Sequence, residues 1–273
     1  MSGAAIDLEQ AGGASLLAGD EGLPYEILNP EGRAPVLLLC DHASNFIPRA
    51  FRSLGLDEAQ LARHIAWDIG VADVTRDLAR RLDAPAAMSR FSRLIVDPNR
   101  QLDDPTLFPQ IGDGVIVPGN RDLSPEARGR RIEAFHQPYH AAIEDRLDAM
   151  ASRGRVPAIV SMHSFTPVMK GFERPWHIGI LWNRDPRLPR PVMDRLRARG
   201  IEVGDNEPYS GRDGHGYTLH RHADARGLAN VLVELRQDLI DTHHGAAEWS
   251  ALLAEVLAEC LADPVAFEVA AAS

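Results

Sequence analysis

The sequence predicts an α/β fold in which a sheet is covered by helices on both faces. Short, continuous apolar runs at 34–40, 156–162 and 231–235 lack the alternation of a half-exposed strand. Such runs are typical of strands that are buried on both sides. Stretches with helical spacing of apolar residues alternate with these runs along the chain, and alternating strands and helices are characteristic of α/β proteins.

The remaining elements follow from local signals in the order of the chain. Ser124 can cap a helix and Pro125 suits its first position, so we expect a helix from Ser124 to about Ser152, bent at Pro138. We also expect helices over 64–82, 190–199 and 246–261, strands over 177–182 and within 88–96, an ordered loop over 101–122 and a polar, glycine-rich segment over 205–217.

The length indicates one domain. A chain of 273 residues is near the upper limit for one hydrophobic core, and the sequence contains neither an internal repeat nor a dividing linker. We expect residues 1–24, which are small and acidic, to form a loose N-terminal arm. Residues 25–273 would then form a single domain.

Composition excludes several classes of partner. The net charge of -10 argues against a general nucleic-acid binder. The sequence lacks an apolar run of the ~20 residues that a membrane helix needs and has no signal-peptide pattern. Cys40 and Cys260 are too few for a disulfide framework. We therefore expect a cytoplasmic protein with no membrane or nucleic-acid partner; the sequence leaves its oligomeric state open.

Polar residues follow the apolar runs where the predicted strands end. In α/β sheets, ligands bind at the carboxyl ends of the strands. The residues at these positions are Asp41, His42, Asp97, Asn99, Arg100, His163, Ser164 and Glu234. We therefore expect two imidazoles, a guanidinium and carboxylates to meet at one edge of the sheet.

This set of residues predicts a catalytic metal site. Catalytic zinc takes three His, Asp or Glu ligands and leaves a fourth position open. His42 and His163 supply two ligands. Asp68, at the expected start of the helix over 64–82, is our choice for the third; Asn45 is the alternative, although its amide carries no charge.

The substrate would be bound and hydrolysed next to this metal. A bound divalent ion lowers the pKa of water to roughly 7, and Glu234 could then accept the proton as general base. Arg100 could grip a substrate carboxylate with both ends of its guanidinium. Arg93, Tyr217 and Arg221 are further candidates for the pocket wall.

Ordered short motifs resemble a known enzyme family. They are the segments 41–48, 92–100, 138–140, 162–164, 216–218 and 233–235. In this order they are similar to the N-formylglutamate amidohydrolase family, and the resemblance spans about residues 25–245. It implies a three-layer fold with a mixed, mostly parallel sheet, as in phosphorylase/hydrolase-like and zinc carboxypeptidase-like proteins.

The resemblance also implies specific roles. His42 and His163 would be metal ligands, Asn99 and Arg100 would bind the substrate carboxylate, and Glu234 would be the base. The expected activity is zinc-dependent hydrolysis of an N-acyl acidic amino acid, with N-formyl-L-glutamate, a compound of histidine catabolism, as the leading substrate. Zinc is the expected cofactor, and another divalent metal is the alternative.

Other interpretations of the same residues stay open at this point. A carboxypeptidase- or aspartoacylase-like hydrolase would act on another N-acyl or peptide substrate. A non-catalytic binding protein for an acidic metabolite is the second class, suggested by Asn45 where carboxypeptidases carry glutamate. Cys40 could be a nucleophile but is more typical of a buried strand end. His136 and His140 share a helix face without the zincin pattern.

Overall fold

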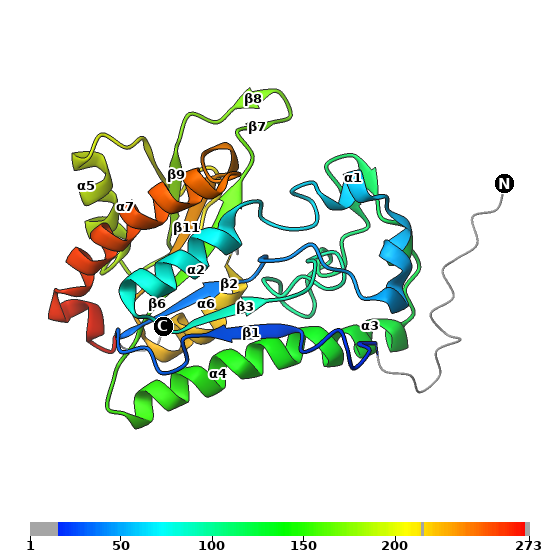
Figure 1. The fold of residues 1–273 in the computed structure, drawn as a ribbon, viewed down its shortest axis with the longest axis horizontal. Helices are drawn as coiled ribbons and strands as arrows, with labels where there is room; N and C mark the ends of the chain where they lie inside the picture. The colour runs from blue at the N-terminus through cyan, green and yellow to red at the C-terminus, as the bar shows by residue number, and fades with distance from the viewer. Residues whose placement is uncertain (1–15, 214–215, 271–273) are drawn as a thin grey trace.

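The computed structural model describes residues 16–213 and 216–270 and has a seven-stranded sheet at its centre (Figure 1). The strand order is β1-β3-β2-β6-β11-β9-β10. The four central strands, β3, β2, β6 and β11, run parallel to one another. β1 is antiparallel to β3, and β9 and β10 run antiparallel to β11. The predicted α/β class with a mixed, mostly parallel sheet is therefore confirmed.

Most of the predicted strands are present with nearly the expected bounds. The strands are β1 Tyr25–Leu28, β2 Val36–Cys40, β3 Ala86–Ser89, β6 Ala158–Phe165, β9 Ile178–Leu181, β10 Val203–Asp205 and β11 Asn230–Arg236. Two hairpins, β4 Ile111–Gly112 with β5 Val115–Ile116 and β7 Val168–Met169 with β8 Phe172–Glu173, stand apart from the main sheet.

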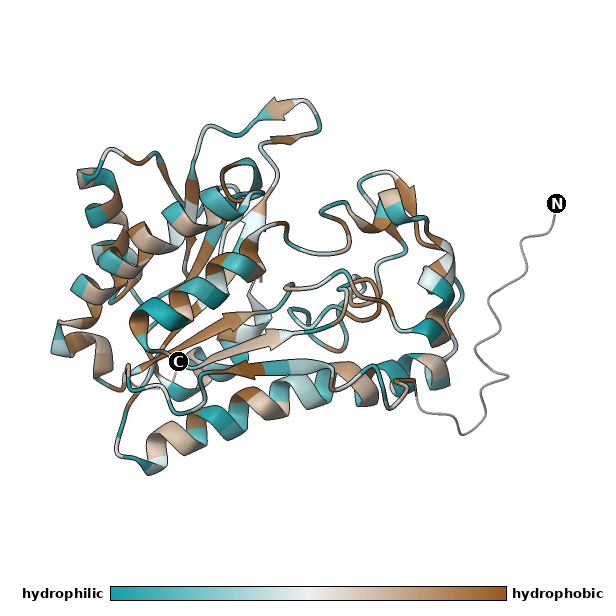
Figure 2. Ribbon diagram, viewed as in Figure 1, coloured by the Kyte–Doolittle hydropathy of each residue, from teal (hydrophilic) through white to brown (hydrophobic). Residues whose placement is uncertain are grey.

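Helices cover both faces of the sheet. On one face lie α2 Val71–Leu82, α5 Pro189–Ala198 and α7 His243–Leu261, and on the other α4 Gln137–Ser152 and α6 Tyr217–His222. The side chains of β2 alternate between these layers: Leu38 packs beneath α2 and α7, and Leu37 and Leu39 pack against α4. Figure 2 shows the apolar strands between helices of mixed polarity. A strand buried on both faces explains the continuous apolar runs.

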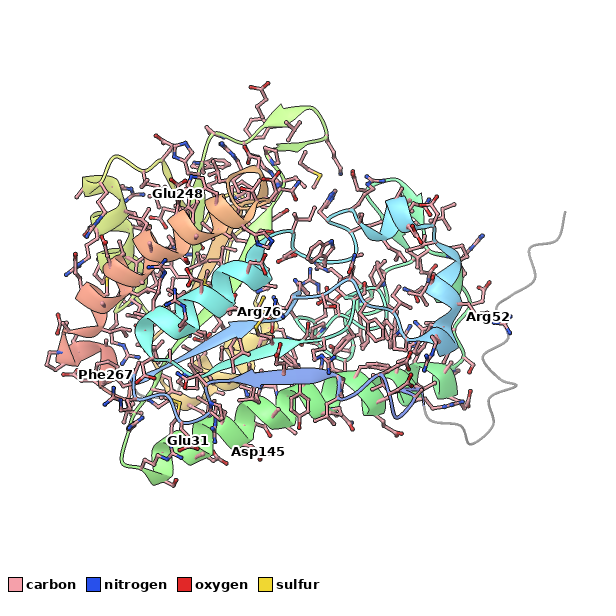
Figure 3. All side chains as sticks on the ribbon, viewed as in Figure 1. Glu31, Arg52, Arg76, Asp145, Glu248 and Phe267 are labelled. Carbon is pink, nitrogen blue, oxygen red and sulfur yellow. The ribbon has the colours of Figure 1, made fainter. Side chains whose placement is uncertain are left out.

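Many charged residues lie on the outside of the three layers. Glu31, Arg52, Asp145 and Glu248 are exposed and project outward (Figure 3). None of the helices in the described residues combines the length and the apolar character that crossing a bilayer requires.

Two sequence predictions placed elements wrongly. The helix predicted over 64–82 begins only at Val71, after the left-handed Gly70 (φ 79°). The predicted strand region 88–96 contains strand only to Ser89; Phe91, Leu94, Ile95 and Val96 belong to a loop that is buried in a separate apolar cluster. In both cases the loop buries apolar side chains, and their spacing in the sequence resembled that of a helix or a strand.

The helix predicted from Ser124 to Ser152 is present but interrupted. α3 Pro125–Arg131 is capped by the Ser124 side chain, a π turn spans Ile132–His136, and α4 follows. Pro138 lacks the N–H that a regular α-helix would use at this point, which explains a local change in hydrogen bonding.

Parts of two predicted segments lie outside the described residues: 1–15 of the N-terminal arm, and 214–215 of the glycine-rich segment. The described end of the arm is anchored. Leu16 is buried against the cluster that contains Phe51, and the Glu21 carboxylate accepts the backbone N–H of Arg49 at 2.9 Å. The arm boundary and the single-domain division stay predictions.

Candidate metal centre and active site

The first group of site residues lies where β2 and β6 approach their carboxyl ends. His42 follows β2, and His163 lies in β6. Asp68 is in the loop before α2, and its backbone N–H donates to the carbonyl of His42 at 3.0 Å. Gly70 permits this loop to turn, because its left-handed backbone packs against Ile240 with no room for a Cβ.

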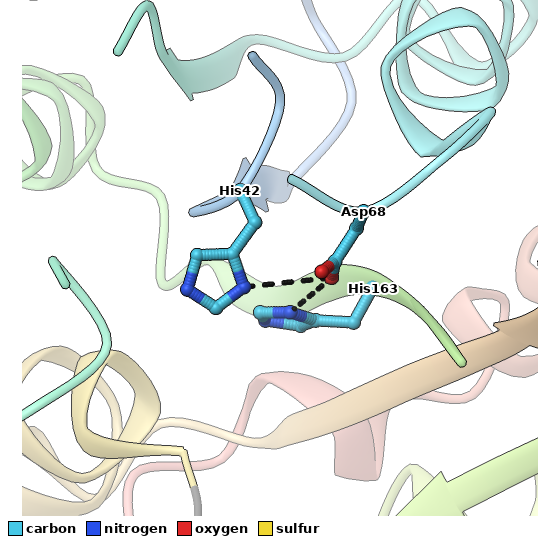
Figure 4. Close-up of side chains that lie close together, drawn as sticks. All are labelled: His42, Asp68 and His163. Atoms are coloured by element: carbon cyan, nitrogen blue, oxygen red, sulfur yellow. Dashed lines mark hydrogen bonds and ion pairs between the residues drawn. The ribbon is translucent and has the colours of Figure 1, made fainter. Parts of the chain in front are cut away.

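His42, Asp68 and His163 form a buried cluster that could hold a metal ion (Figure 4). Each residue offers one ligand atom, and these atoms lie within 4.8 Å of one another. Asp68 Oδ2 is 3.0 Å from His163 Nδ1 and 3.5 Å from His42 Nδ1. His42 Nδ1 has no hydrogen-bond partner, although it is buried.

Further carboxylates hold the other nitrogen of each imidazole. His42 Nε2 lies 2.8 Å from Asp97 Oδ1, and His163 Nε2 lies 3.2 Å from Asp41 Oδ2. Tyr139 in turn donates its hydroxyl to Asp41 at 2.8 Å. An imidazole that donates Nε2–H to a carboxylate presents the lone pair of Nδ1 to the cluster when the ring is neutral. Carboxylates in these positions would fix the tautomer of metal-binding histidines.

Hydrogen bonds and ion pairs within the cluster shift the pKa values of its buried groups. Burial alone would lower the pKa of His163, but hydrogen bonds to Asp41 and Asp68 raise it to about 10. Burial opposes ionisation of Asp97, yet Arg93 and His42 hold its pKa well below the usual range. The carboxylates therefore stay ionised and demand a positive charge between Asp68 and the imidazoles, either a proton or a metal ion.

Glu234 lies beside this cluster. It lies on β11, in register with His163 on the neighbouring strand β6, is only 7% exposed, and its Oε2 has no hydrogen-bond partner. Burial raises the pKa of Glu234 to about 7. Both residues line one cavity of about 180 Å³ together with His42 and Asp68.

Three of the five predicted substrate-binding residues line the same cavity, namely Arg93, Asn99 and Arg100. Asn99 accepts the backbone N–H of Thr218 through Oδ1 at 3.0 Å. Arg100 donates to Thr106 and to the carbonyl of Asn99. Arg93 donates twice to Asp97, at 2.6 and 3.0 Å. The loop 97–100 thus links the carboxylate behind His42 to the guanidinium in the cavity.

The structure places the other two elsewhere. Tyr217 begins α6, stacks against His136 and meets His140 edge-on, and Arg221, one turn later, pairs with Glu144 of α4 at 2.8 Å. Neither lines the cavity of Glu234. A short helix that was not predicted, α6, turns them toward α4, and their assignment to the substrate pocket stays a prediction.

Asn45 is outside the cluster. Its side chain donates to the carbonyl of Leu61 at 3.1 Å, so Asp68 and not Asn45 accompanies the two imidazoles. Cys40 is fully buried, and burial raises the pKa of its thiol. A buried thiol that resists ionisation is unsuited to act as a nucleophile.

His136 and His140 are buried and hold the loop that carries Arg100. His136 Nε2 lies 3.2 Å from the carbonyl of Arg100, and His140 Nε2 lies 2.9 Å from that of Pro98. His140 Nδ1 is 2.8 Å from His222 Nε2. The shared helix face predicted from their spacing is therefore a packing face beneath the site.

Sequence reasoning noted Asp41 and Asp97 as strand-end residues but assigned them no role. The available signal was their place in the sequence: Asp41 directly precedes His42, and Asp97 lies three residues before Arg100. His64, Tyr209 and Arg174 were missed; His64 and Tyr209 line the cavity and Arg174 bonds to Tyr209. No spacing pattern in the sequence marked these three residues.

Comparisons with known proteins agree with the motif analysis. The family model of N-formylglutamate amidohydrolase matches residues 34–241. An N-formylglutamate deformylase from Pseudomonas putida is 28% identical over 232 residues, which cover 76% of this chain and 82% of that protein.

Two crystal structures are similar over most of their length. A gene product of Agrobacterium tumefaciens is 35% identical with a TM-score of 0.88, covering 90% of this chain and 98% of the other. An N-formylglutamate amidohydrolase from Ralstonia eutropha is 21% identical with a TM-score of 0.68, covering 88% and 98%. The second likeness supports the fold.

Proposed function

Because this chain belongs to the N-formylglutamate amidohydrolase family, we propose that it hydrolyses N-formyl-L-glutamate to formate and L-glutamate at a divalent metal centre. The family supports an amidohydrolase that acts on a linear amide. The metal, the residue roles and the substrate of this particular chain are the parts that we propose.

The donor set fits zinc. Two imidazole nitrogens and one carboxylate oxygen are a common ligand set of catalytic zinc. In a tetrahedron with bonds of about 2.1 Å, two ligand atoms are about 3.4 Å apart. Asp68 Oδ2 lies 3.5 and 3.0 Å from the two Nδ1 atoms. When bound, the ion would act as a Lewis acid on the formyl carbonyl and on water.

Glu234 is the proposed general base. Its carboxylate lines the same cavity as the metal cluster, and a pKa of about 7 suits a group that accepts and returns a proton near neutral pH. A cation at the cluster would lower this pKa, because it favours the ionised form. Glu234 would take a proton from the attacking water and pass it to the leaving nitrogen of glutamate.

Asn99 and Arg100 are the proposed binding site for the α-carboxylate of the substrate. They line the cavity together with Arg93. Arg93 is largely neutralised by Asp97, so Arg100 is the guanidinium with more capacity to bind a ligand. A bidentate guanidinium–carboxylate contact would place the amide bond toward the metal cluster.

One observation carries the proposal. His42 Nδ1 is buried without a partner and faces Asp68, while carboxylates occupy the Nε2 side of both imidazoles. This arrangement supports a metal site, because carboxylates in these positions orient histidine ligands.

The test measures formate or amine release over a panel of N-formyl, N-acetyl and peptide derivatives of Glu, Asp and neutral amino acids. We expect about one zinc per chain, loss of activity on chelation and its return with zinc. Turnover of N-acetyl or peptide substrates in preference to N-formyl compounds would support the aspartoacylase- or carboxypeptidase-like alternative. Tight binding of acidic ligands with no turnover would support a binding protein.

The Glu234→Gln variant tests the base. We expect its zinc content to equal that of the unaltered protein and its turnover to fall by about 10² or more. Glu26→Gln is the matched control, because Glu26 lies on the edge strand β1 of the same sheet. Undiminished turnover in Glu234→Gln would remove Glu234 from the mechanism.

A further inference from the structure

A second, larger cavity adjoins the cavity of the metal cluster. We call it the outer chamber; its volume is about 470 Å³. It shares His64, Arg93, Arg100 and Tyr209 with the inner cavity of about 180 Å³. The hairpins β4–β5 and β7–β8 contribute to its walls through Gly112, Asp113, Met169 and Lys170. A substrate in the inner cavity would therefore lie next to the outer chamber.

The outer chamber has an excess of positive charge. Besides Arg93 and Arg100, it is lined by Lys170 and Arg174, against the two carboxylates of Asp97 and Asp113. Both carboxylates are already paired. Asp97 is bonded to Arg93 at 2.6 Å, and Asp113 lies 2.5 Å from Arg63, outside the chamber.

Arg174 is the unusual member of this set. It is only 7% exposed, yet among residues 16–213 and 216–270 no carboxylate lies within 4.0 Å of its guanidinium. Its hydrogen bonds go to the carbonyl and hydroxyl of Thr166 at 3.2 and 3.1 Å and to the hydroxyl of Tyr209 at 3.2 Å. A guanidinium has five N–H donors, so donors remain for a ligand.

The surroundings of Arg174 hold it in place without neutralising it. Its guanidinium lies over the rings of Tyr209, at 5.1 Å, and Phe165, at 5.6 Å. Tyr209 and Phe165 both line the inner cavity. A buried cation without a counter-ion lowers the stability of the folded protein. An anionic ligand that bound to Arg174 would supply the missing counter-ion.

We propose that Arg174, assisted by Lys170, binds the side-chain carboxylate of the substrate and so selects dianionic N-acyl amino acids. This inference rests on the proposed function. It divides the two anions between two sites: Arg100 and Asn99 bind the α-carboxylate, and Arg174 binds the second. Arg174 is therefore a specificity-determining residue.

The test compares N-formyl-L-glutamate with N-formyl-L-glutamine, which has nearly the same shape and a neutral side chain. The quantity measured is the ratio of their kcat/KM values. We expect Arg174→Gln to lower this ratio by about 10², chiefly through the glutamate substrate, because a buried charge pair is lost. Lys170→Gln, on the exposed hairpin, is expected to lower it by about 3-fold.

Two controls separate specificity from general damage. Arg100→Gln should weaken turnover of both substrates and leave their ratio unchanged, because both carry the α-carboxylate. Arg190→Gln removes an arginine that stacks on Trp182 at 5.7 Å and lines neither cavity, and should change neither rate. A wild-type ratio in a folded Arg174→Gln variant would overturn the proposal.

The design also distinguishes failure of the proposed function. If the unaltered protein hydrolyses neither compound, the hydrolase proposal fails, and calorimetric binding of L-glutamate against L-glutamine then tests the subsite directly. Equal affinities would overturn it, and a glutamate preference that Arg174→Gln abolishes would support it. If Arg174→Gln does not fold, Arg174→Met, which keeps an apolar stem over the two rings, and Lys170→Gln decide; unchanged ratios in both would overturn the proposal.

Discussion

The Asp97→Asn variant probes how the carboxylate behind His42 prepares the proposed metal site. Asp97 is buried and accepts from His42 Nε2 at 2.8 Å, from Arg93 at 2.6 and 3.0 Å, and from the backbone N–H of Asn99 at 2.9 Å. Asparagine keeps the shape and one acceptor, but it removes the negative charge and turns an amide donor toward Arg93 or His42.

Two energies change, and they can be measured separately. Loss of the charged partner makes His42 a weaker ligand, which typically lowers metal affinity by about 10- to 100-fold, or about 1.4–2.7 kcal/mol. Breaking the buried pair with Arg93 costs about 3 kcal/mol of folding free energy. Arg93 keeps a more distant contact with Asp68 at 3.7 Å, so the folded protein should remain available for metal titration.

The assay is a competition for zinc against a chromophoric chelator at neutral pH, run on folded protein, with a urea unfolding curve for each variant. Asp77→Asn is the matched control. Asp77 also pairs with arginines, Arg80 and Arg81, and accepts the hydroxyl of Ser250, but it lies on α2 outside the site. Asp77→Asn should lose stability and keep its zinc affinity. Equal zinc affinities in Asp97→Asn, Asp77→Asn and the unaltered protein would show that the Asp97 carboxylate does not strengthen His42 as a metal ligand.

Two further predictions concern stability. Burial lowers the pKa of His222 from 6.5 to about 4, so the folded state favours the neutral imidazole. The neutral imidazole therefore contributes on the order of 3 kcal/mol to the free energy of unfolding above pH 6.5. This contribution is lost as the pH falls toward 4, because the unfolded state binds the proton more readily. Urea unfolding of His222→Gln at pH 7.5 and 4.5 should show a smaller pH dependence than the unaltered protein, and an identical dependence would contradict the assignment. Gly70→Ala should cost about 3 kcal/mol or more, because the backbone is left-handed at φ 79° and an added Cβ would be 2.1 Å from the carbonyl oxygen of Ile240. Gly114→Ala is the control, because Gly114 has φ 77° and open space around an added Cβ; its loss of stability, about 1 kcal/mol, reflects backbone strain alone. Thermal unfolding measures the stability of both variants. Equal losses of stability would show that the contact with Ile240 is unimportant.

The sequence determined the class of fold and predicted the sheet edge of the candidate site. Strands that are buried on both faces must be apolar throughout, so β2, β6 and β11 were visible as continuous runs. A polar residue at the end of such a run is conspicuous for the same reason. His42, His163 and Glu234 could therefore be singled out before their neighbours were known, and their common cavity agrees with that expectation.

Only the tertiary structure decided what surrounds these residues. The helix that was expected to begin near His64 begins at Val71, and the loop before it carries Asp68 to the two imidazoles. The pairing of Asp41 and Asp97 with Nε2 atoms depends on side-chain directions at the ends of β2 and β6 and in the loop that carries Asp97. Sequence spacing does not encode such contacts, because the partners are 55 and 122 residues apart.

The same limit applies to the walls of the substrate pocket. Tyr217 belongs to one of the family-like motifs and Arg221 follows it by four residues, but α6 turns both toward α4. Arg174 lies in a short hairpin region that has no periodic signal, yet long-range packing against Tyr209 brings it to the outer chamber. Local sequence patterns identify strand ends that bear polar, potentially functional residues. The positions of side chains in loops and short helices depend instead on contacts that form only when the whole chain packs.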